Sequence, residues 1–308
     1  MGFKPIVVDE VKKISKMSIL VNGVAIESFN FPAGETHVRL SGVETPRSTS
    51  IDIEANLINS DTVMQLLLTV DGIRRMRPSV EINLTIPYFP YSRQDRVCNF
   101  GEALSVRVMA DLINSLNCQQ VTIVDPHSDV TPALLNNCRV ITQADVIIGS
   151  PLHDRIVKEN WVLISPDTGA IKKIHQLGRM LSSEDFQPDI FYGDKIRDTQ
   201  TGRIVSTQFT GDVAGRTVLI VDDICDGGRT FIELAKKLQE RKVKSIYLYV
   251  THGIFSKGLD ILQAYFDQIY CYHVFPNYVE PTDDFLHILK TTNSRTNHIE
   301  GRDKASLV

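Results

Sequence analysis

The stretch Val218-Leu-Ile-Val-Asp-Asp-Ile-Cys-Asp-Gly-Gly-Arg-Thr230 decides the fold of this chain. It opens with four apolar residues in a row, three of them β-branched, which predicts a buried strand. After Thr230, apolar side chains at 231, 232, 234, 235 and 238 follow the spacing of a helix. A buried strand that passes through a short turn into a helix is typical of a parallel sheet covered by helices.

The turn between this strand and this helix has the chemistry of a sugar phosphate site. Gly227 and Gly228 would let backbone N–H groups converge on an anion, which the positive end of the helix also favours. Asp222 and Asp223 would repel a phosphate, but carboxylates accept hydrogen bonds from vicinal hydroxyls. A diol beside a phosphate most simply means a ribose phosphate. The structural alternative is an ordinary glycine turn after a strand, because short motifs also match by accident.

Composition places the chain among globular proteins. Its 308 residues predict two domains, and 43% hydrophobic residues are typical of a globular protein. The net charge of -4 argues against broad nucleic-acid binding. No apolar run approaches the ~20 residues of a membrane span, and the first residues do not resemble a signal peptide. The 5 cysteines are scattered without a Cys-x-x-Cys pair, so neither a disulfide framework nor a zinc site is expected. We expect a cytoplasmic protein that contacts neither membrane nor nucleic acid.

Strands and helices alternate along most of the chain. Residues 5–30 alternate apolar and polar side chains around the hairpin signal Asn22-Gly23. Further strands are expected at 36–40, 49–58, 81–86, 121–124, 161–164, 189–192, 204–209, 245–250 and 268–273. Helices are expected at 61–77, with Asp61 as its N-cap, and at 102–116, 151–159, 170–180, 230–241 and 256–265. The order predicts an α/β fold of two mostly parallel sheets flanked by helices, with domains 1–145 and 146–296 and a polar tail 297–308.

Two polar segments follow expected strands in the first half, where ligands of open α/β sheets bind. The loop after residue 86 carries Arg93, Gln94 and Asp95, and a guanidinium suits the oxygens of a triphosphate. Its alternative is a solvated loop with Arg–Asp pairs. Asp125-Pro-His127 follows the next strand, and this histidine can ligate a metal or pair with phosphate, although a lone histidine is more often structural.

Two more polar segments lie in the second half. Asp167 stands at a strand-to-helix turn, where Mg²⁺ ligands are common and ordinary N-caps are commoner. Lys195 and Arg197 are two apart, so an extended segment would project both to one side. Such an arm could close over a transferring phosphoryl group, and the alternative is a charged β-hairpin.

In chain order, the polar segments resemble the ribose-phosphate diphosphokinase (PRPP synthetase) family over roughly residues 31–251. The segments are Tyr-Phe-Pro-Tyr-Ser-Arg-Gln-Asp-Arg, Asp-Pro-His, Ser-Pro-Asp-Thr-Gly, Asp-Lys-Ile-Arg and Val-Asp-Asp-Ile-Cys-Asp. The last segment alone also resembles type I phosphoribosyltransferases, but these lack the Arg-Gln-Asp and Lys-x-Arg elements. The resemblance implies two phosphoribosyltransferase-like domains in tandem, with ATP at their junction.

The resemblance also implies a reaction and a role for each matched residue. A Mg²⁺-dependent enzyme would transfer the β,γ-diphosphoryl group of ATP to the anomeric hydroxyl of ribose 5-phosphate, giving PRPP and AMP. The adenine-side loop of this family usually reaches a neighbouring subunit, which implies a homo-oligomer, a dimer or a hexamer. The implied roles are ATP binding for Phe31, Glu35, Arg93, Gln94, Asp95 and His127, Mg²⁺ binding for His127 and Asp167, catalysis for Lys195 and Arg197, and ribose-phosphate binding for Asp222, Asp223, Asp226, Gly227, Gly228, Arg229 and Thr230.

The sequence departs from the family pattern at several of these places. Ala33 replaces an Asn or Asp of the adenine-side loop, and Val97 and Cys98 replace charged residues. In the phosphate loop Gly227 replaces a hydroxyl residue and Arg229 adds a cation, which would suit a larger 5-substituent such as the diphosphate of ADP-ribose. We expect ribose 5-phosphate as the acceptor and keep ADP-ribose as the alternative. A phosphoribosyltransferase and a non-catalytic regulatory member of the family are the other readings.

Overall fold

A computed structural model describes residues 18–43, 49–197, 204–275 and 285–289. Of residues 194–197, 204–208 and 210 it describes the backbone only. The chain forms two compact units, Met1–Ile141 and Thr142–Val308. Residues 142–145, which we expected in the first domain, thus fall in the second unit, where α5 (Gln143–Ile148) begins. The expected tail 297–308 lies outside the described residues.

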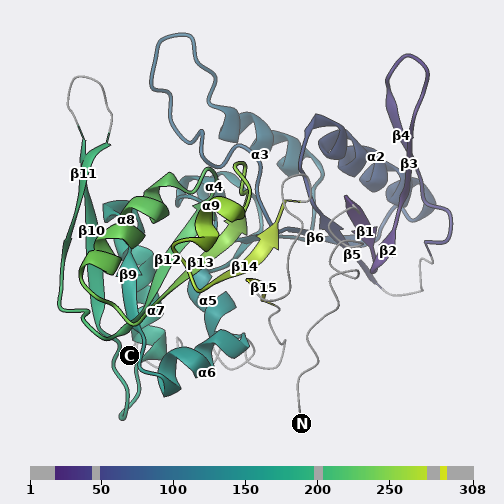
Figure 1. The fold of residues 1–308 in the computed structure, drawn as a ribbon. Coiled ribbons are helices and arrows are strands. Elements are labelled where there is room, and N and C mark those ends of the chain that lie inside the picture. The colour runs from purple at the N-terminus through teal and green to yellow at the C-terminus, as the bar shows by residue number, and fades with distance from the viewer. Residues whose placement is uncertain (1–17, 44–48, 198–203, 276–284, 290–308) are drawn as a thin grey trace, which may run out of the picture. The chain divides into compact units, whose positions relative to one another are not determined.

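The first unit contains a sheet with the strand order β2-β1-β5-β6-β7-β8 (Figure 1). Strands β5 to β8 are parallel neighbours, whereas β1 is antiparallel to both β2 and β5. The strands are β1 Ile19–Val21, β2 Val24–Ala25, β5 Ser50–Ala55, β6 Glu81–Ile86, β7 Gln120–Val124 and β8 Cys138–Ile141, and the helices are α2 Ser60–Met76, α3 Ser105–Ser115 and α4 Val130–Leu134. Apolar side chains of these strands and helices form one continuous core. The mostly parallel sheet expected here is confirmed.

Turn and cap signals near the N-terminus had different outcomes. Asn22 (φ 49°) and Gly23 (φ 78°) form the turn between antiparallel β1 and β2, as the hairpin signal predicted. The prediction of Asp61 as the cap of α2 was wrong, because the helix begins earlier. Asn59 is the N-cap: its side chain accepts a hydrogen bond from Thr62 N (2.9 Å), and Thr62 Oγ1 accepts one from Asn59 N (3.2 Å).

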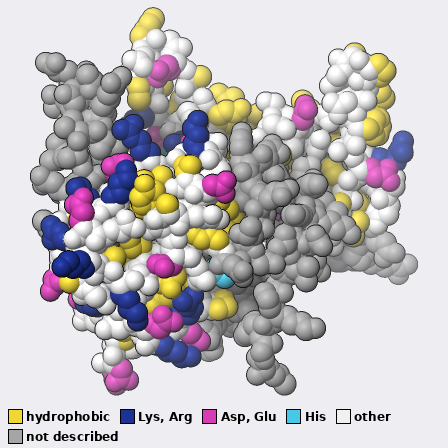
Figure 2. Space-filling model, in the orientation of Figure 1, with side chains coloured by type: hydrophobic (Ala, Val, Ile, Leu, Met, Phe, Trp, Pro, Cys, Tyr) yellow, Lys and Arg dark blue, Asp and Glu magenta, His cyan; other side chains and the backbone are white. Residues whose placement is uncertain are grey.

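A separate two-stranded hairpin, β3 (Glu27–Asn30) and β4 (Thr36–Arg39), projects from the first unit (Figure 1). Every residue of β3 is exposed. Phe29 and Phe31 pack edge to face with centroids 5.4 Å apart, and both rings contact His37. Figure 2 shows hydrophobic side chains along one edge of this projection. The hairpin therefore presents aromatic surface rather than burying it in its own unit.

The second unit contains a sheet with the order β11-β10-β9-β12-β13-β14-β15, parallel except for the β10–β11 pair. Its strands are β9 Val162–Ser165, β10 Ile190–Arg197, β11 Ile204–Thr210, β12 Thr217–Cys225, β13 Ser245–Gly253, β14 Gln268–Val274 and β15 Leu286–Ile288. Its other helices are α6 Pro151–Lys158, η1 Thr168–Ala170, α7 Ile171–Leu181, α8 Arg229–Glu240 and α9 Asp260–Gln263. The helix expected at 256–265 is thus much shorter than predicted, and the parallel sheet is again confirmed. No helix among the described residues of either unit is long and apolar enough to cross a membrane.

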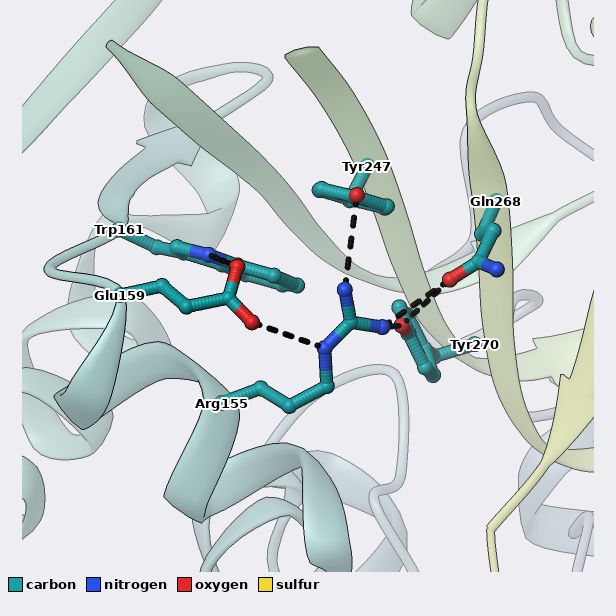
Figure 3. Close-up of polar contacts among 6 residues, drawn as sticks. All are labelled: Arg155, Glu159, Trp161, Tyr247, Gln268 and Tyr270. Atoms are coloured by element: carbon teal, nitrogen blue, oxygen red, sulfur yellow. Dashed lines mark hydrogen bonds and ion pairs between the residues drawn. The ribbon is translucent and has the colours of Figure 1, made fainter.

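The two faces of this second sheet carry different chemistry. Ile220 and Leu248 lie on the face where α8 packs its apolar side, in the main core of the unit. Side chains alternate along a strand, so Tyr247 lies on the opposite face. There it stacks on Trp161 with centroids 4.4 Å apart, and the guanidinium of Arg155, from α6, lies over both rings (Figure 3).

Candidate functional site

The strand β12 carries the central carboxylates. It runs to Cys225, past the residues 218–221 that the apolar run predicted. Neighbouring β13 is equally long, and its ladder pairs Asp222 with Val250 and Ile224 with His252. The carboxylates are therefore held inside a hydrogen-bonded strand, not at its loose end, which fixes their backbone positions.

The surroundings of the two carboxylates disfavour a negative charge on Asp222. Asp223 is 8% exposed, and its Oδ2 lies 3.4 Å from Nζ of Lys173 on α7. Asp222 Oδ1 accepts a hydrogen bond from Asp223 N (2.9 Å). Burial, and then the charge of Asp223, raise the pKa of Asp222 well above its ordinary value. Hydroxyl donors or a cation close to Asp222 would therefore favour its ionised form.

The turn that follows β12 suits an anion. Gly228 has φ 73°, a backbone conformation that favours glycine, and a Cβ there would also displace the end of the Leu262 side chain, 2.9 Å away. It is the N-cap of α8, which begins at Arg229, one residue before the predicted start, and its cap makes no side-chain hydrogen bond. The first N–H groups of a helix have no partners within the helix, and a phosphate is a suitable acceptor for them.

Asp167 lies in the same region as the carboxylate pair. It is the N-cap of η1, and its Oδ1 accepts a hydrogen bond from Gly169 N (3.0 Å), which matches the capping alternative. Asp167 follows β9, the parallel neighbour of β12, and its negative charge contributes to the raised pKa of Asp222. The described part of the chain holds no group of three or more His, Cys, Asp or Glu side chains arranged for a metal ion.

Lys195 and Arg197 lie on β10, which forms an antiparallel hairpin with β11. The ladder pairs Lys195 with Thr207 and Arg197 with Ile204, with an irregularity between positions 196 and 197. The hairpin alternative therefore describes their backbone. Their side chains and residues 198–203 lie outside what is described, so the catalytic role of this arm stays a prediction.

The loop after β6 positions Arg93, Gln94 and Asp95 in the first unit. Phe89 and Ser92 are buried at 2% exposure and anchor the loop to the core. Gln94 N donates to Tyr91 O (2.9 Å), and Val106 N at the start of α3 donates to Gln94 O (3.4 Å). Arg93 and Gln94 are exposed and Asp95 is half-buried. The loop thus holds its charged side chains at the surface on a fixed backbone.

The remaining candidates of the first unit lie at two further places. Phe31 and Glu35 share the turn of the β3–β4 hairpin, where Phe31 N donates to Glu35 O (2.8 Å), and both side chains are exposed. His127 is exposed just after β7, next to Asp125, which is buried with φ 40°. The position that caps the following α4 is Asp129, not Asp125.

Two residues that touch the site were missing from the sequence prediction. Lys173 pairs with Asp223, and Ser256 Oγ donates to Asp226 Oδ1 (2.5 Å). The signal for the first was a lysine in the opening turn of α7, where the helix dipole disfavours a cation unless a carboxylate lies close by. Ser256 follows β13 with no comparable signal.

Comparisons with known proteins agree with this division of the chain. Residues 10–116 match the N-terminal domain of ribose phosphate pyrophosphokinase, and residues 147–283 match the phosphoribosyl transferase domain. The chain is 30% identical to the ribose-phosphate pyrophosphokinase of Pasteurella multocida over 253 residues, 80% of this chain and 76% of that one. It is 29% identical to the enzyme of that name from Aquifex aeolicus, over 73% of this chain and 70% of the other.

A solved structure extends the agreement to the fold. Phosphoribosylpyrophosphate synthetase from Mycobacterium smegmatis matches with a TM-score of 0.68 at 22% identity, covering 94% of this chain and 92% of that one. The first matched region includes the hairpin and the Arg93 loop, and the second includes the β12–α8 turn. The resemblance inferred from the motifs is confirmed, and the chain is an enzyme of the ribose-phosphate pyrophosphokinase family.

Proposed function

We propose that this enzyme transfers the β,γ-diphosphoryl group of ATP to the anomeric hydroxyl of ribose 5-phosphate. One observation carries the proposal: Asp222 and Asp223 are fixed inside β12, directly before the glycine turn that opens α8. This places acceptors for sugar hydroxyls beside a helix end that favours a phosphate. The relatives that are 29% and 30% identical are named ribose-phosphate pyrophosphokinase, and this name supports the same substrate class.

Acceptor binding would offset the cost of the carboxylate pair. The 2- and 3-hydroxyls of the ribose would donate hydrogen bonds to Asp222 and Asp223, which favours the ionised form of both. Lys173 would hold Asp223 ionised and in place through its 3.4 Å contact. The 5-phosphate would accept from the first amides of α8, and Thr230 could add a hydroxyl there.

Magnesium would suit the donor side of the reaction. Mg²⁺ prefers one or two carboxylates together with substrate phosphates, so the oxygens of Asp167 and Asp222 fit it. The family resemblance adds His127 as a further contact. When bound, the ion would neutralise charge on the phosphates of ATP. Arg93 and Gln94 would bind ATP, and Phe31 and Glu35 its adenine side.

The chemical step would rest on positioning and charge. The anomeric hydroxyl attacks the β-phosphorus in line, the bond to the α-phosphate oxygen breaks, AMP leaves, and the hydroxyl proton is released. Lys195 and Arg197 would offset the charge that develops on the transferring group and on the leaving phosphate. Closure of the β10–β11 arm would also keep water from the nucleotide.

The exposed aromatic hairpin supports a proposal about assembly. Phe31 is 48% exposed next to Phe29, and aromatic surface of this kind is common where another subunit binds. We propose a homo-oligomer, a dimer or a hexamer, in a cytoplasmic setting. Sedimentation of the protein alone and with ATP would measure its size.

The test is a product analysis by mass spectrometry. The protein is incubated with Mg·ATP and ribose 5-phosphate, and AMP together with a diphosphorylated ribose phosphate is expected. Formation of ADP would mean transfer of one phosphoryl group and would contradict the proposal. Unchanged nucleotide with every ribose tried would favour the regulatory reading. Release of pyrophosphate from added PRPP and a base would favour a phosphoribosyltransferase.

A second acceptor is supported by the phosphate loop. Gly227 carries no side chain, and Arg229 is exposed at the first residue of α8. A guanidinium at this place would suit a 5-diphosphate, as in ADP-ribose. Competition between ribose 5-phosphate and ADP-ribose at limiting ATP, expressed as kcat/KM, decides which acceptor is preferred.

A further inference from the structure

The segment that follows β13 is fastened to the phosphate loop. Ile254 N and Phe255 N both donate to Cys225 O (2.8 and 3.0 Å), and Ser256 N donates to Asp226 O (3.2 Å). Ser256 Oγ adds a hydrogen bond to Asp226 Oδ1 (2.5 Å). The residue after Ser256 is therefore held in a defined place relative to the turn at Gly227.

That next residue is Lys257. Its Cγ lies 3.7 Å from where a Cβ of Gly227 would be, so the aliphatic stem of the lysine packs against the glycine. Lys257 is exposed and forms no ion pair with any residue that the structure describes. Its side chain thus starts at the border of the phosphate loop, and its ammonium is at most three bonds beyond the Cγ that packs there.

The first turn of α8 carries a basic side chain where acidic ones are usual. A helix N-terminus favours acidic residues, yet the first turn of α8 has none and begins with Arg229. Arg229 is exposed and, within the described part of the chain, has no ion-pair partner. The carboxylate of Asp226 in the same turn accepts the hydrogen bond from Ser256. Two cations therefore flank Gly227 and Gly228 at a helix end that is already positive.

The two cations differ in where they stand: Arg229 begins α8, whereas Lys257 follows β13. The first amides of α8 and Arg229 would contact the phosphoryl group next to the sugar. A 5-diphosphate has further oxygens and further negative charge beyond the first phosphoryl group, on the side away from the sugar. A second cation next to the glycine turn would suit that outer group.

We propose that Lys257 is a specificity-determining residue that binds the second phosphoryl group of a ribose with a 5-diphosphate substituent, such as ADP-ribose. This inference rests on the proposed function, because it takes the loop before α8 as the site of the acceptor phosphate. Lys257 touches the outer phosphoryl group only, so ribose 5-phosphate is bound without it. The residue thereby tunes which acceptor is used and takes no part in the transfer step.

The test compares acceptors in Lys257→Met, which keeps the packing of the stem against Gly227 and removes the charge. Titration calorimetry with ADP-ribose and with ribose 5-phosphate measures binding, and kcat/KM measures turnover. Loss of one charged contact corresponds to about a ten- to hundredfold effect, which we expect for ADP-ribose. We expect a change of less than about threefold for ribose 5-phosphate, since no contact to it is lost.

Two further variants make the result specific to this position. Lys257→Arg keeps the cation and should retain most of the ADP-ribose affinity. Lys244→Met removes another exposed lysine, at the opposite end of β13, and should change neither acceptor.

The outcomes separate this inference from the proposed function. If the wild type converts ribose 5-phosphate but neither binds nor converts ADP-ribose, the inference is overturned and the proposed function stands. Equal losses for both acceptors in Lys257→Met would likewise overturn the specificity role. If the wild type converts neither acceptor, the proposed function fails, and with it the inference that depends on it.

Discussion

Charged side chains at the two ends of the sheet in the second unit have different surroundings. Near the amino ends of its strands, Arg155 lies over the rings of Trp161, Tyr247 and Tyr270 at 4.9, 5.3 and 5.9 Å. Its guanidinium donates to Gln268 Oε1 (3.0 Å) and to the hydroxyl of Tyr270, and it contacts Glu159 at 3.4 Å (Figure 3). This cation has its partners within the fold.

Toward the carboxyl end of β12 the charged groups are carboxylates, and they have fewer partners. Asp222 and Asp223 are consecutive carboxylates, and Lys173 is the cation that pairs with Asp223. The raised pKa of Asp222 shows that the fold disfavours its charge. Polar groups that are satisfied within the protein stabilise it, whereas groups that the fold leaves poorly compensated are the ones suited to a ligand.

The largest effect is expected at the functional end, in Lys195→Ala and Arg197→Ala. Each should lower kcat by about a hundredfold or more, because these cations would act mainly in the transition state, while ATP binding changes little. Steady-state kinetics with a parallel nucleotide-binding measurement checks this. The thermal midpoint should stay near that of the wild type. Wild-type turnover in both variants would show that the β10–β11 arm is not the catalytic element.

The carboxylate pair should show a trade of activity against stability. We expect Asp222→Asn and Asp223→Asn to lower kcat/KM for the acceptor about ten- to hundredfold, because hydrogen bonds from the ribose hydroxyls to charged acceptors weaken. Asp222→Asn should leave the free energy of unfolding unchanged or raise it, since it removes a desolvated charge. Asp185→Asn, at an exposed position of the same unit, is the control.

The pH dependence of stability sharpens the same prediction. The pKa of Asp222 in the folded protein lies above its ordinary 3.8, so the folded state keeps this proton to higher pH than the unfolded state does. The resulting stabilisation is fully present below that value and is lost as the pH rises through the raised pKa. Denaturant titrations across this range should show the loss in the wild type and a flatter profile in Asp222→Asn. Identical profiles would mean that Asp222 is not strained by its surroundings.

At the structural end, Arg155→Met should cost stability and leave chemistry intact. The variant keeps an aliphatic stem but loses the hydrogen bonds and the stacking, which together amount to about 2 to 3 kcal/mol in the free energy of unfolding. Urea denaturation measures the loss, and kcat of the folded protein should remain that of the wild type. Arg179→Met, on the exposed side of α7, should change neither quantity. A large drop in kcat would break the division between the two ends.

How far the sequence could predict these ends depends on how local their causes are. The strand, the glycine turn and the helix at 218–238 follow from apolar spacing and glycine positions, which are local properties. The extension of β12 through Asp222 and Asp223 could not be predicted in this way, because the ladder with β13 imposes it. The start of the short α9 was also misjudged: Gly258 has φ 79°, which is not helical, so the helix cannot include the residues before it.

Side-chain partners were harder still to predict. Nothing local pairs Arg155 with Tyr270 or Gln268, which lie more than a hundred positions away in the chain. The motifs correctly indicated the family, but Lys173 emerged only from its contact with Asp223, 50 positions further along the chain. The cap at Asn59 was missed for a smaller reason, since both Asn59 and Asp61 are good caps and the helix start decides between them.

The smallest effect is expected from Tyr270→Phe, which removes one hydroxyl from the Arg155 cluster. The ring and its stacking remain, so the loss at neutral pH should be about 1 kcal/mol in the free energy of unfolding. Burial raises the pKa of Tyr270 to about 12, from an ordinary value of 10.0. The wild type should therefore keep this stabilisation below pH 10 and lose it as the pH rises through about 12, because the unfolded state releases the phenol proton first.

Tyr270→Phe has no such proton, so the difference in stability between wild type and variant should shrink, and can change sign, on the alkaline side. Denaturant titrations at neutral pH and at increasing alkaline pH measure this convergence, with Tyr265→Phe, a half-buried tyrosine of the same unit, as the matched control. A constant difference at every pH would mean that the phenol of Tyr270 ionises as easily in the folded protein as in the unfolded chain. The polar groups around Arg155 would then not be fully paired within the fold. Arg155 would be as free to bind a ligand as the carboxylates of β12.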